Sequence, residues 1–461
     1  MGASKSVKVF LAAGLAVWAL GAAPGSVRQA QAYTDYYQTG VATCNDCHVG
    51  QGYGFHRGGV ARCNGCHTMH NSQNGTLMTY NRGGSVGSSF PSLLRASDPT
   101  SVCLYCHHNN AGHRDERIDI IVSTFPTPAN LTPGGDFGWL KKNYAWSGGA
   151  SPGAAHGHNV VGQDFGYTAD PRFTEGPGGA YPAATLSCVS CHDPHGRYRR
   201  LGDGSEIPEG VRIRSSGSSG QAPGSYAVGS YRLLAGAGYA TSQAPEHAFV
   251  HRTPVAVLPS YPVNEDWDTG STWRDTVNRS EAVSDTRVGY GTGMAEWCAN
   301  CHAAIHNPSY PANLRHPAGS TAQLGSAIAA NYNAYVKTGD LSGSEAASFT
   351  SLVPFETGQT DLALLQSLAT SSTAGPQADA NVSCLTCHRA HASGWDSIGR
   401  WNFQTTFVTY AGNWPGTDGG DPEETHQGRT RAETRLAYYD RPPTRFATYQ
   451  RSLCNKCHVK D

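Results

Sequence analysis

Apolar residues form an unbroken run at only one place in this chain, near its beginning. Residues 9–20 are apolar behind two lysines, and a small-x-small cleavage site ends at Ala32. The run is shorter than the about 20 residues of a membrane-spanning helix, and no other stretch is apolar enough to cross a membrane. We therefore expect residues 1–32 to be a signal peptide and residues 33–461 to be an exported protein.

Two later segments carry the apolar period of a helix that packs on one side. The first covers 322–337, with its apolar residues at Leu324, Ile328, Tyr332 and Val336 and a stop near Gly339. The second covers 361–368, with Asp361 at its start and Leu364, Leu365 and Leu368 on one side. Elsewhere we expect mostly coil, with short helices and little strand.

All cysteines of the chain fall in one recurring pattern, Cys-x-x-Cys-His, hereafter the haem motif. Its seven copies are Cys44, Cys47 and His48; Cys63, Cys66 and His67; Cys103, Cys106 and His107; Cys188, Cys191 and His192; Cys298, Cys301 and His302; Cys384, Cys387 and His388; and Cys454, Cys457 and His458. In c-type haem attachment, two thiols bond to the porphyrin and the following imidazole binds the iron. A zinc ribbon or a thioredoxin-like pair does not need a histidine after each cysteine pair. The sequence predicts seven covalently bound haem c groups.

Composition and motif spacing together predict the fold class. The 55 glycines and 26 prolines exceed the usual combined share of about 12 %, so the side chains alone make a poor core. The motifs are unevenly spaced and run from one end to the other, which excludes a solenoid repeat. We expect one elongated domain: a multihaem cytochrome c, mostly coil with short α-helices wrapped around a haem stack and little β.

Two other regions have a distinctive composition. Four aromatic residues follow a Pro-Gly-rich segment, and they are expected either to pack on haem faces or to form an ordinary aromatic cluster under a loop: Phe137, Trp139, Tyr144 and Trp146. Residues 200–245 are rich in Gly, Ser and Ala and are predicted to be surface loop.

Histidine is numerous enough to fill the second axial position of each iron. Of 20 histidines, seven belong to the motifs, whereas the chain has only four methionines, including the first residue. Ligation by two histidines gives a lower potential than His/Met ligation. We therefore expect low-potential haems with both axial positions filled.

The position of a histidine relative to a haem motif indicates which ones supply the second ligand. A histidine three or four residues after the proximal one lies on the wrong face of its own haem and is free to reach another iron. Four fit this description: His70, His195 and His391 at three residues, and His306 at four. The next candidates are His158, His316 and His56. The others are expected to be polar or propionate-contacting: His108, His113, His156, His247, His251 and His426.

Charge excludes one class of partner. Removing residues 1–32 takes away three basic residues and no acidic one, so the formal charge moves from −1 to −4. Haem propionates make the protein more acidic still, and nucleic-acid binding would need a basic face.

Three functions are compatible with these features. An iron with two imidazoles has no open position, which favours an electron conduit over an enzyme. A monomeric electron shuttle in the periplasm or at the surface is the first alternative. A multihaem oxyanion reductase is the second, but such an enzyme needs an odd proximal ligand or an empty distal side.

The flanks of the motifs resemble those of the OmcS-type family of nanowire-forming, outer-surface multihaem c-type cytochromes. The similar segments are 55–71, 132–142, 188–200, 296–302, 314–319, 384–394 and 449–458. The resemblance implies a continuous stack of bis-histidine haems in a chain that polymerises head to tail into extracellular filaments. It also implies that His70 ligates a haem of the neighbouring subunit, and that other redox proteins or extracellular acceptors receive the electrons.

The chain departs from the family pattern at its N-terminus. The family has six haems, whereas the first motif here lies upstream of the shared region, in 33–53. The additional haem either lengthens the stack at the subunit junction or branches from it. It also leaves open whether His56 serves this haem.

Overall fold

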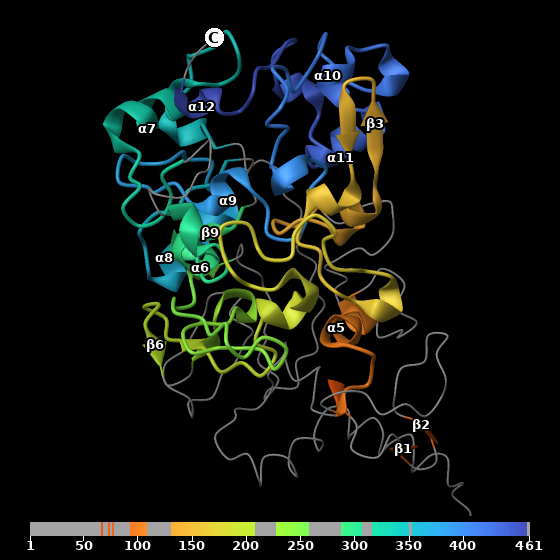
Figure 1. Cartoon of the computed structure of the whole chain (residues 1–461). Helices are drawn as coiled ribbons and strands as arrows, with labels where there is room; N and C mark the ends of the chain where they lie inside the picture. Colours follow the sequence, from red (N-terminus) through yellow and green to blue (C-terminus); the bar gives the residue numbers. More distant parts are fainter. Residues whose placement is uncertain are drawn as a thin grey trace, which may run out of the picture.

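The computed structural model describes residues 66–67, 72–73, 76–77, 93–107, 131–207, 227–257, 287–306, 316–349 and 353–458 (Figure 1). Its α-helices are α5 (Pro99–His107), α6 (Met294–Cys298), α7 (Gly325–Ala334), α8 (Leu362–Ser371), α9 (Cys384–Cys387), α10 (Glu423–His426), α11 (Arg431–Ala437) and α12 (Asn455–His458). Short 3-10 turns are η4 (Phe137–Lys141), η5 (Gly153–His156), η6 (Gln163–Phe165), η7 (Ala183–Thr185), η8 (Cys188–Ser190), η9 (Tyr231–Leu233), η11 (Ala303–His306), η12 (Glu345–Ala347), η13 (Asp396–Ile398), η14 (Thr417–Gly419) and η15 (Pro443–Arg445). Long irregular segments join them, as the sequence predicted.

The strands are short and pair only locally within these residues. They are β1 (Ser72–Gln73), β2 (Thr76–Leu77), β3 (Tyr144–Trp146), β4 (Gly149–Ser151), β5 (Arg199–Arg200), β6 (Glu206–Ile207), β7 (Val228–Gly229), β8 (Val255–Val257) and β9 (Gly289–Thr292). All pairs are antiparallel, in the orders β1-β2, β3-β4, β6-β5-β7 and β8-β9. No helix of the described part is long and apolar enough to cross a membrane.

Both predicted helices are confirmed. Helix α7 lies inside the predicted 322–337, and α8 begins where Asp361 accepts a hydrogen bond from the Leu364 amide at 2.9 Å. The expected buried side of α8 was wrong at Leu364, which is 57 % exposed. Leu365 is buried as expected, and the buried stripe of α8 is Leu362, Leu365 and Ala369, packed against Val255 and Val257 of β8.

The predicted surface loop at 200–245 is wrong for 227–236, whereas most of 237–245 is exposed as predicted. Val228, Leu233 and Ala235 are buried, and β7 pairs with β5. Small residues allow this close packing: a Cβ on Gly236 would lie 2.9 Å from Thr253. A composition typical of loops therefore marks a tightly packed segment here.

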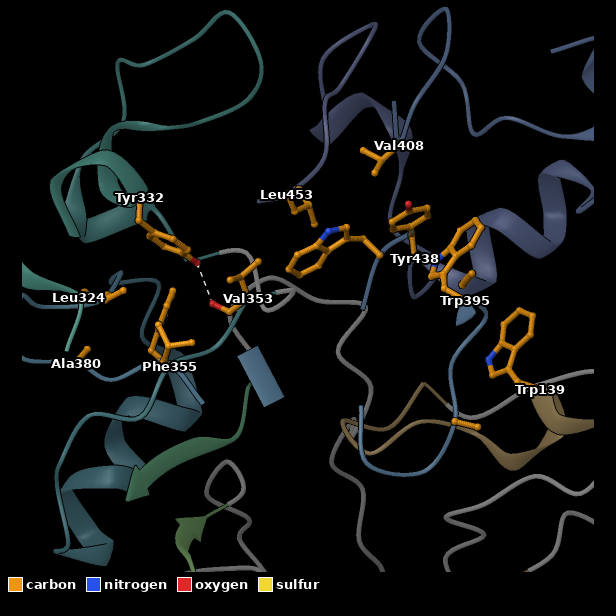
Figure 2. Packing of buried hydrophobic residues seen from close by; sticks show 14 of the residues in the cluster. Trp139, Leu324, Tyr332, Val353, Phe355, Ala380, Trp395, Val408, Tyr438 and Leu453 are labelled. Atoms are coloured by element: carbon orange, nitrogen blue, oxygen red, sulfur yellow. Dashed lines mark hydrogen bonds between the residues drawn. The ribbon is translucent and has the colours of Figure 1, made fainter. Parts of the chain in front are cut away.

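The largest apolar cluster joins segments that are far apart in the sequence (Figure 2). Trp414 stacks on Tyr438 at 4.5 Å between ring centroids, and Trp395 lies 5.3 Å from the same ring. Trp139 and Tyr144 also belong to this cluster, so these two of the four aromatics follow the aromatic-cluster alternative. Through this cluster the β3-β4 region packs against the C-terminal third of the chain.

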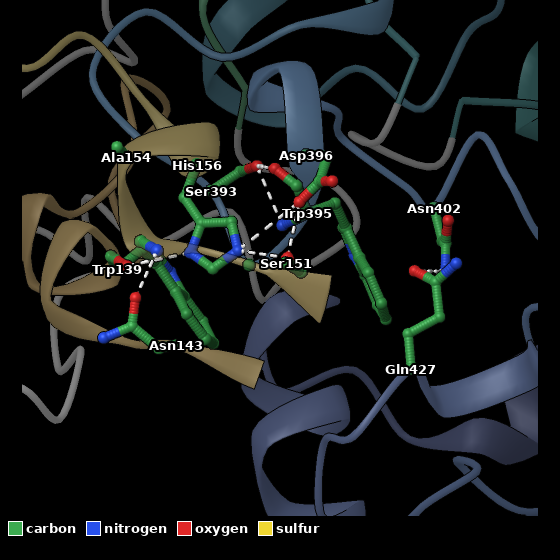
Figure 3. Close-up of polar contacts among 12 residues, drawn as sticks. Trp139, Asn143, Ser151, Ala154, His156, Ser393, Trp395, Asp396, Asn402 and Gln427 are labelled. Carbon is green, nitrogen blue, oxygen red and sulfur yellow. Dashed lines mark hydrogen bonds and ion pairs between the residues drawn. The ribbon is translucent and has the colours of Figure 1, made fainter. Parts of the chain in front are cut away.

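A buried polar network beside this cluster contains His156 (Figure 3). The Nδ1 atom of His156 lies 2.9 Å from the Trp139 carbonyl oxygen, and its Nε2 atom lies 2.7 Å from the Ser151 hydroxyl. Arg429 donates to the same hydroxyl at 3.1 Å, and Ser151 donates to Asp396. Desolvation lowers the pKa of His156 to about 4. Both ring nitrogens of His156 are thus used by the protein, in keeping with its exclusion from the ligand candidates.

Candidate haem sites

Each of the last four haem motifs is a single helical turn. The amide of the motif histidine donates to the carbonyl of the first motif cysteine, at 3.0 Å for His192, 3.1 Å for His302, 2.9 Å for His388 and 3.1 Å for His458. Residues three and four apart in such a turn share one face. Both thiols and the imidazole of a motif therefore point to the same side, as attachment to one porphyrin requires.

Polar residues beside the motifs start these turns. In the fourth motif the Ser187 amide donates to Ser190 Oγ at 3.0 Å, and in the sixth the Ser383 amide donates to Thr386 Oγ1 at 3.0 Å. Before the fifth motif, the Glu356 carboxylate caps the start of α6 and accepts a hydrogen bond from the Met294 amide at 2.9 Å. These caps replace hydrogen bonds that a one-turn helix cannot make internally.

The thiols of consecutive motifs lie next to one another. A hydrogen bond from Cys103 lowers the pKa of the Cys188 thiol, and a hydrogen bond with Cys384, together with burial, raises the pKa of Cys298. Burial raises the pKa of Cys387 to about 12, with further contributions from Cys454 and Cys457. Motifs that are consecutive in sequence are therefore neighbours in space from the third to the seventh.

Four motif histidines face a second histidine ring. The ring centroids are 6.4 Å apart for His67 and His195, 6.3 Å for His192 and His391, 6.0 Å for His302 and His158, and 6.0 Å for His458 and His316. Two imidazole nitrogens bound to one metal at about 2 Å each would place their ring centroids about 6 Å apart. The four pairs thus fit an iron held between two histidines.

Two glycines and an aromatic ring set the position of His391. A Cβ on Gly134 would lie 3.1 Å from the His391 ring, and one on Gly135 would lie 1.8 Å from the Ala392 carbonyl oxygen. The amide of His391 donates to the Gly134 carbonyl at 2.6 Å. Phe137 stacks on the imidazole with centroids 4.8 Å apart, so this aromatic packs against a candidate haem ligand.

His158 is held by the segment that follows the sixth motif. Its amide donates to the His391 carbonyl at 2.9 Å, and its Nδ1 atom lies 2.6 Å from the Ala390 carbonyl oxygen. Desolvation lowers the pKa of His158 to about 4 and that of His391 to about 3. Both rings are therefore neutral at physiological pH, which is the form that binds metal.

The remaining candidates are placed as follows. Several lie outside the described residues: Cys44, Cys47, His48, His56, Cys63 and His70. The side chains of Cys106 and His306 are likewise not described. His426 is buried, and its Nδ1 atom accepts from the Gly428 amide at 3.1 Å.

Three backbone carbonyl oxygens, of Pro177, Arg232 and Ser397, each lie 2.7 Å from the Nδ1 atom of a motif histidine. The sequence did not predict these partners, because every residue type has a backbone carbonyl.

One-turn motifs with adjoining thiols, together with four motif histidines that each face a second imidazole, define a multihaem c-type cytochrome. The comparisons with known proteins agree and identify the family. The chain belongs to the OmcS family: it is 46 % identical over 459 residues to the C-type cytochrome OmcS of Geobacter sulfurreducens, covering 95 % of this chain and 98 % of the relative.

Two solved structures match the fold as well. A cryo-EM structure of OmcS nanowires from Geobacter sulfurreducens has a TM-score of 0.74 at 43 % identity, and an Outer Membrane Cytochrome S filament from the same organism has 0.76 at 44 %. Each comparison covers 88 % of this chain and 100 % of the solved chain. No protein-family model matches the sequence.

Proposed function

We propose that this chain is a heptahaem c-type cytochrome that is exported, polymerises head to tail into extracellular filaments, and carries electrons along them. The relatives support the filament, since they are described as nanowires and as a filament of an outer-membrane cytochrome. The facing imidazoles of this chain are the observation that carries the electron-transfer function.

Ligation by two histidines supports a conduit rather than a catalyst. Haem c, once attached, supplies an iron that exchanges single electrons. The paired imidazoles would hold the iron from both sides and would leave no position for a substrate. Desolvation keeps His158 and His391 neutral, so that their lone pairs are available for the metal.

The order of the motifs supports one continuous path. Cys103 contacts Cys188, and Cys298 contacts Cys384. Cys301 raises the pKa of Cys191, which links the fourth motif to the fifth, and Cys454 acts in the same direction on Cys387. We infer that the haems follow one another in sequence order, with α5 toward one end and α12, beside the C-terminus, toward the other (Figure 1).

The histidines three residues after a motif suggest the ligand of the subunit junction. His195, after the fourth motif, faces His67 of the second, and His391, after the sixth, faces His192 of the fourth. Each is thus directed two motifs back. Continued across a head-to-tail junction and counted over the six motifs from the second to the seventh, without the added first one, this order assigns His70 to the sixth motif, His388, of the neighbouring subunit.

A second series of histidines precedes the even-numbered motifs. His158, between the third and fourth motifs, faces His302 of the fifth, and His316, between the fifth and sixth, faces His458 of the seventh. His56 lies between the first and second motifs. By the same rule His56 would serve His107 of the third motif, which leaves the added first haem to another histidine.

The extra haem and the N-terminal processing remain part of the proposal. Residues 1–32 are assigned to a signal peptide and 33–461 to one domain. The first motif, Cys44, Cys47 and His48, would place a seventh haem at the subunit junction, where it either extends or branches the row.

Electron microscopy of the secreted, haem-loaded protein tests the function directly. Filaments with a regular subunit repeat, conducting when deposited between electrodes, are expected. Compact particles alone under all tested salt and pH conditions would contradict the filament and favour a soluble shuttle.

A further inference from the structure

The described residues contain three pairs of consecutive non-glycine residues with left-handed backbone conformations, which their side chains disfavour. One pair is Tyr439 and Asp440, and the other two lie beside haem motifs. Arg232 and Leu233 have φ of 55° and 53°, and Ser397 and Ile398 have φ of 57° and 58°. Glycine adopts this region freely, whereas branched side chains such as that of isoleucine do so only at a cost. Surrounding contacts must hold such residues in place. We call these two segments the left-handed turns.

Both turns present a carbonyl to the proximal imidazole of a haem motif. The carbonyl oxygen of Arg232 lies 2.7 Å from Nδ1 of His192, and that of Ser397 lies 2.7 Å from Nδ1 of His388. These nitrogens are the ones that face away from the metal in a ligand bound through Nε2. The carbonyls therefore accept the hydrogen bond that fixes the imidazole tautomer.

The next residue of each turn binds the chain just beyond the proximal histidine. The amide of Asp193 donates to the Leu233 carbonyl at 2.7 Å, and the amide of Arg389 donates to the Ile398 carbonyl at 2.8 Å. Each motif is thus held at two consecutive positions by two consecutive carbonyls.

A third hydrogen bond closes each contact. The amide of Ala235 donates to the Cys191 carbonyl at 2.9 Å, and that of Arg400 donates to the Cys387 carbonyl at 2.8 Å. The arrangement therefore repeats atom for atom at the fourth and sixth motifs, although the two turns share little sequence.

The second motif shows the same backbone pattern. Leu93 has φ of 58°, Leu94 pairs with His67, and the Arg95 amide donates to the Cys66 carbonyl at 2.9 Å. These three motifs, the second, fourth and sixth, are the ones followed by a histidine after three residues: His70, His195 and His391. The turn and the displaced histidine therefore occur together.

The fifth motif reaches a comparable contact with a glycine. The Pro177 carbonyl lies 2.7 Å from Nδ1 of His302, and Gly178, with φ of 71°, accepts from the Ala304 amide at 2.6 Å. Pro177 itself has a negative φ, so the feature shared with the fourth and sixth motifs is the left-handed residue that follows the carbonyl facing Nδ1.

We propose that the left-handed turns are positioning elements for the proximal histidines, an inference that rests on the proposed haem-binding function. Their carbonyls hold His192 and His388 in one tautomer and make them stronger donors to iron, which lowers the reduction potential of those two haems. By binding the residue after the proximal histidine, they also direct the following chain, and its histidine, toward another haem.

Ser397 offers the cleanest test, because its side chain is exposed and loses no packing when changed. Unlike the turn of Pro177 and Gly178, this turn has two consecutive left-handed residues, so Ser397→Pro, which forbids a positive φ, changes its backbone and displaces the carbonyl. We expect the reduction potential of one haem to rise, because the ligand loses about tenfold of its preference for ferric over ferrous iron. For one electron this is a rise of about 59 mV. Ser397→Val, which disfavours the conformation without forbidding it, should give a smaller rise that is measurable even where the proline variant does not fold. Ser397→Gly should keep the wild-type potential.

Ala411 provides the matched control. It is exposed and left-handed, with φ of 48°, but its carbonyl accepts from Asn413 Nδ2 at 3.1 Å and not from an imidazole. Ala411→Pro and Ala411→Val should leave all potentials unchanged in spectroelectrochemical titration. Unchanged potentials in both Ser397 variants, or equal shifts in the Ala411 variants, would overturn the proposal. Haem content and spin state are measured on the same samples. A wild-type protein without bound haem, or without low-spin haem, would instead refute the proposed function.

Discussion

His192 and His391 come from different haem motifs, yet their rings face each other with centroids 6.3 Å apart. His192 is the proximal histidine of the fourth motif, and His391 follows the sixth by three residues. One short segment therefore supplies both the proximal histidine candidate of the sixth motif, His388, and the ring that faces the fourth motif.

Replacing His391 with alanine should open one axial position. In the haem-loaded His391→Ala protein, we expect one high-spin haem in the visible and electron paramagnetic resonance spectra, with the total haem content unchanged. His251→Ala is the control, since His251 faces no motif histidine among the described ring contacts. A fully low-spin His391→Ala protein would contradict the assignment.

His70→Ala should impair assembly without reducing haem content. If His70 ligates the neighbouring subunit's sixth haem, its loss removes an axial bond at each junction. We expect short or absent filaments by electron microscopy, with haem bound normally by the pyridine haemochrome assay. Filaments of normal length and stability from this variant would refute the junction ligand.

Gly135→Ala should destabilise the His391 site strongly. The φ of Gly135 is 95°, and an added Cβ would lie 1.8 Å from the Ala392 carbonyl oxygen. We expect a loss of about 3 kcal/mol or more in denaturant unfolding, together with altered haem ligation. Gly166→Ala is the matched control: its φ is 69° but nothing lies within 4 Å, so about 1 kcal/mol is expected. Equal losses in the two variants would show that the contact is unimportant.

Glu356 should make stability depend on pH. Burial, with a smaller contribution from Glu296, raises the pKa of this carboxyl from 4.5 to about 7. The folded state therefore holds its proton more tightly than the unfolded state. The free energy of unfolding should fall by about 3 kcal/mol as pH rises from 4.5 to 7 and be flat above. Glu356→Gln should remove this fall in the free energy of unfolding. The same pH dependence in this variant as in the wild type would contradict the role of Glu356.

Substituting Cys44 and Cys47 with alanine tests the haem number. The double variant should carry one haem fewer than the wild type by mass spectrometry of the intact protein. If the added haem branches from the row, filaments should persist, and if it extends the row, their assembly should change. An equal haem count in both proteins would exclude the first motif as an attachment site.

Local sequence patterns predicted the parts of the site that depend on residue type. Cys-x-x-Cys-His alone predicts the thiols and proximal imidazoles, and the spacing to the preceding histidine picked out His195 and His391, whose rings the structure places opposite motif histidines. The pairing of His158 with His302 was not predictable, because it depends on a contact between His158 and Ala390 made only in the folded chain. The acceptors at Arg232 and Ser397 are backbone carbonyl oxygens, which every residue type has, so the sequence does not predict them.

The same distinction explains the fold. Helices α7 and α8 were predictable from their apolar period and from Asp361 as a cap. The burial of Val228 and Leu233 was not, since glycine and serine around them are typical of exposed loops. The position of Val228 and Leu233 depends on packing against β5 and against a haem motif. Neither contact produces a periodic pattern of apolar residues in the sequence.

The spin state of the oxidised, haem-loaded protein tests the central claim most directly. Low-temperature electron paramagnetic resonance, combined with a pyridine haemochrome count on the same sample, reports how many irons are bound and how many are six-coordinate. We predict seven haems per chain, all low-spin. Far fewer than seven haems, or several high-spin irons at rest, would contradict a row of metal centres each held between two histidines.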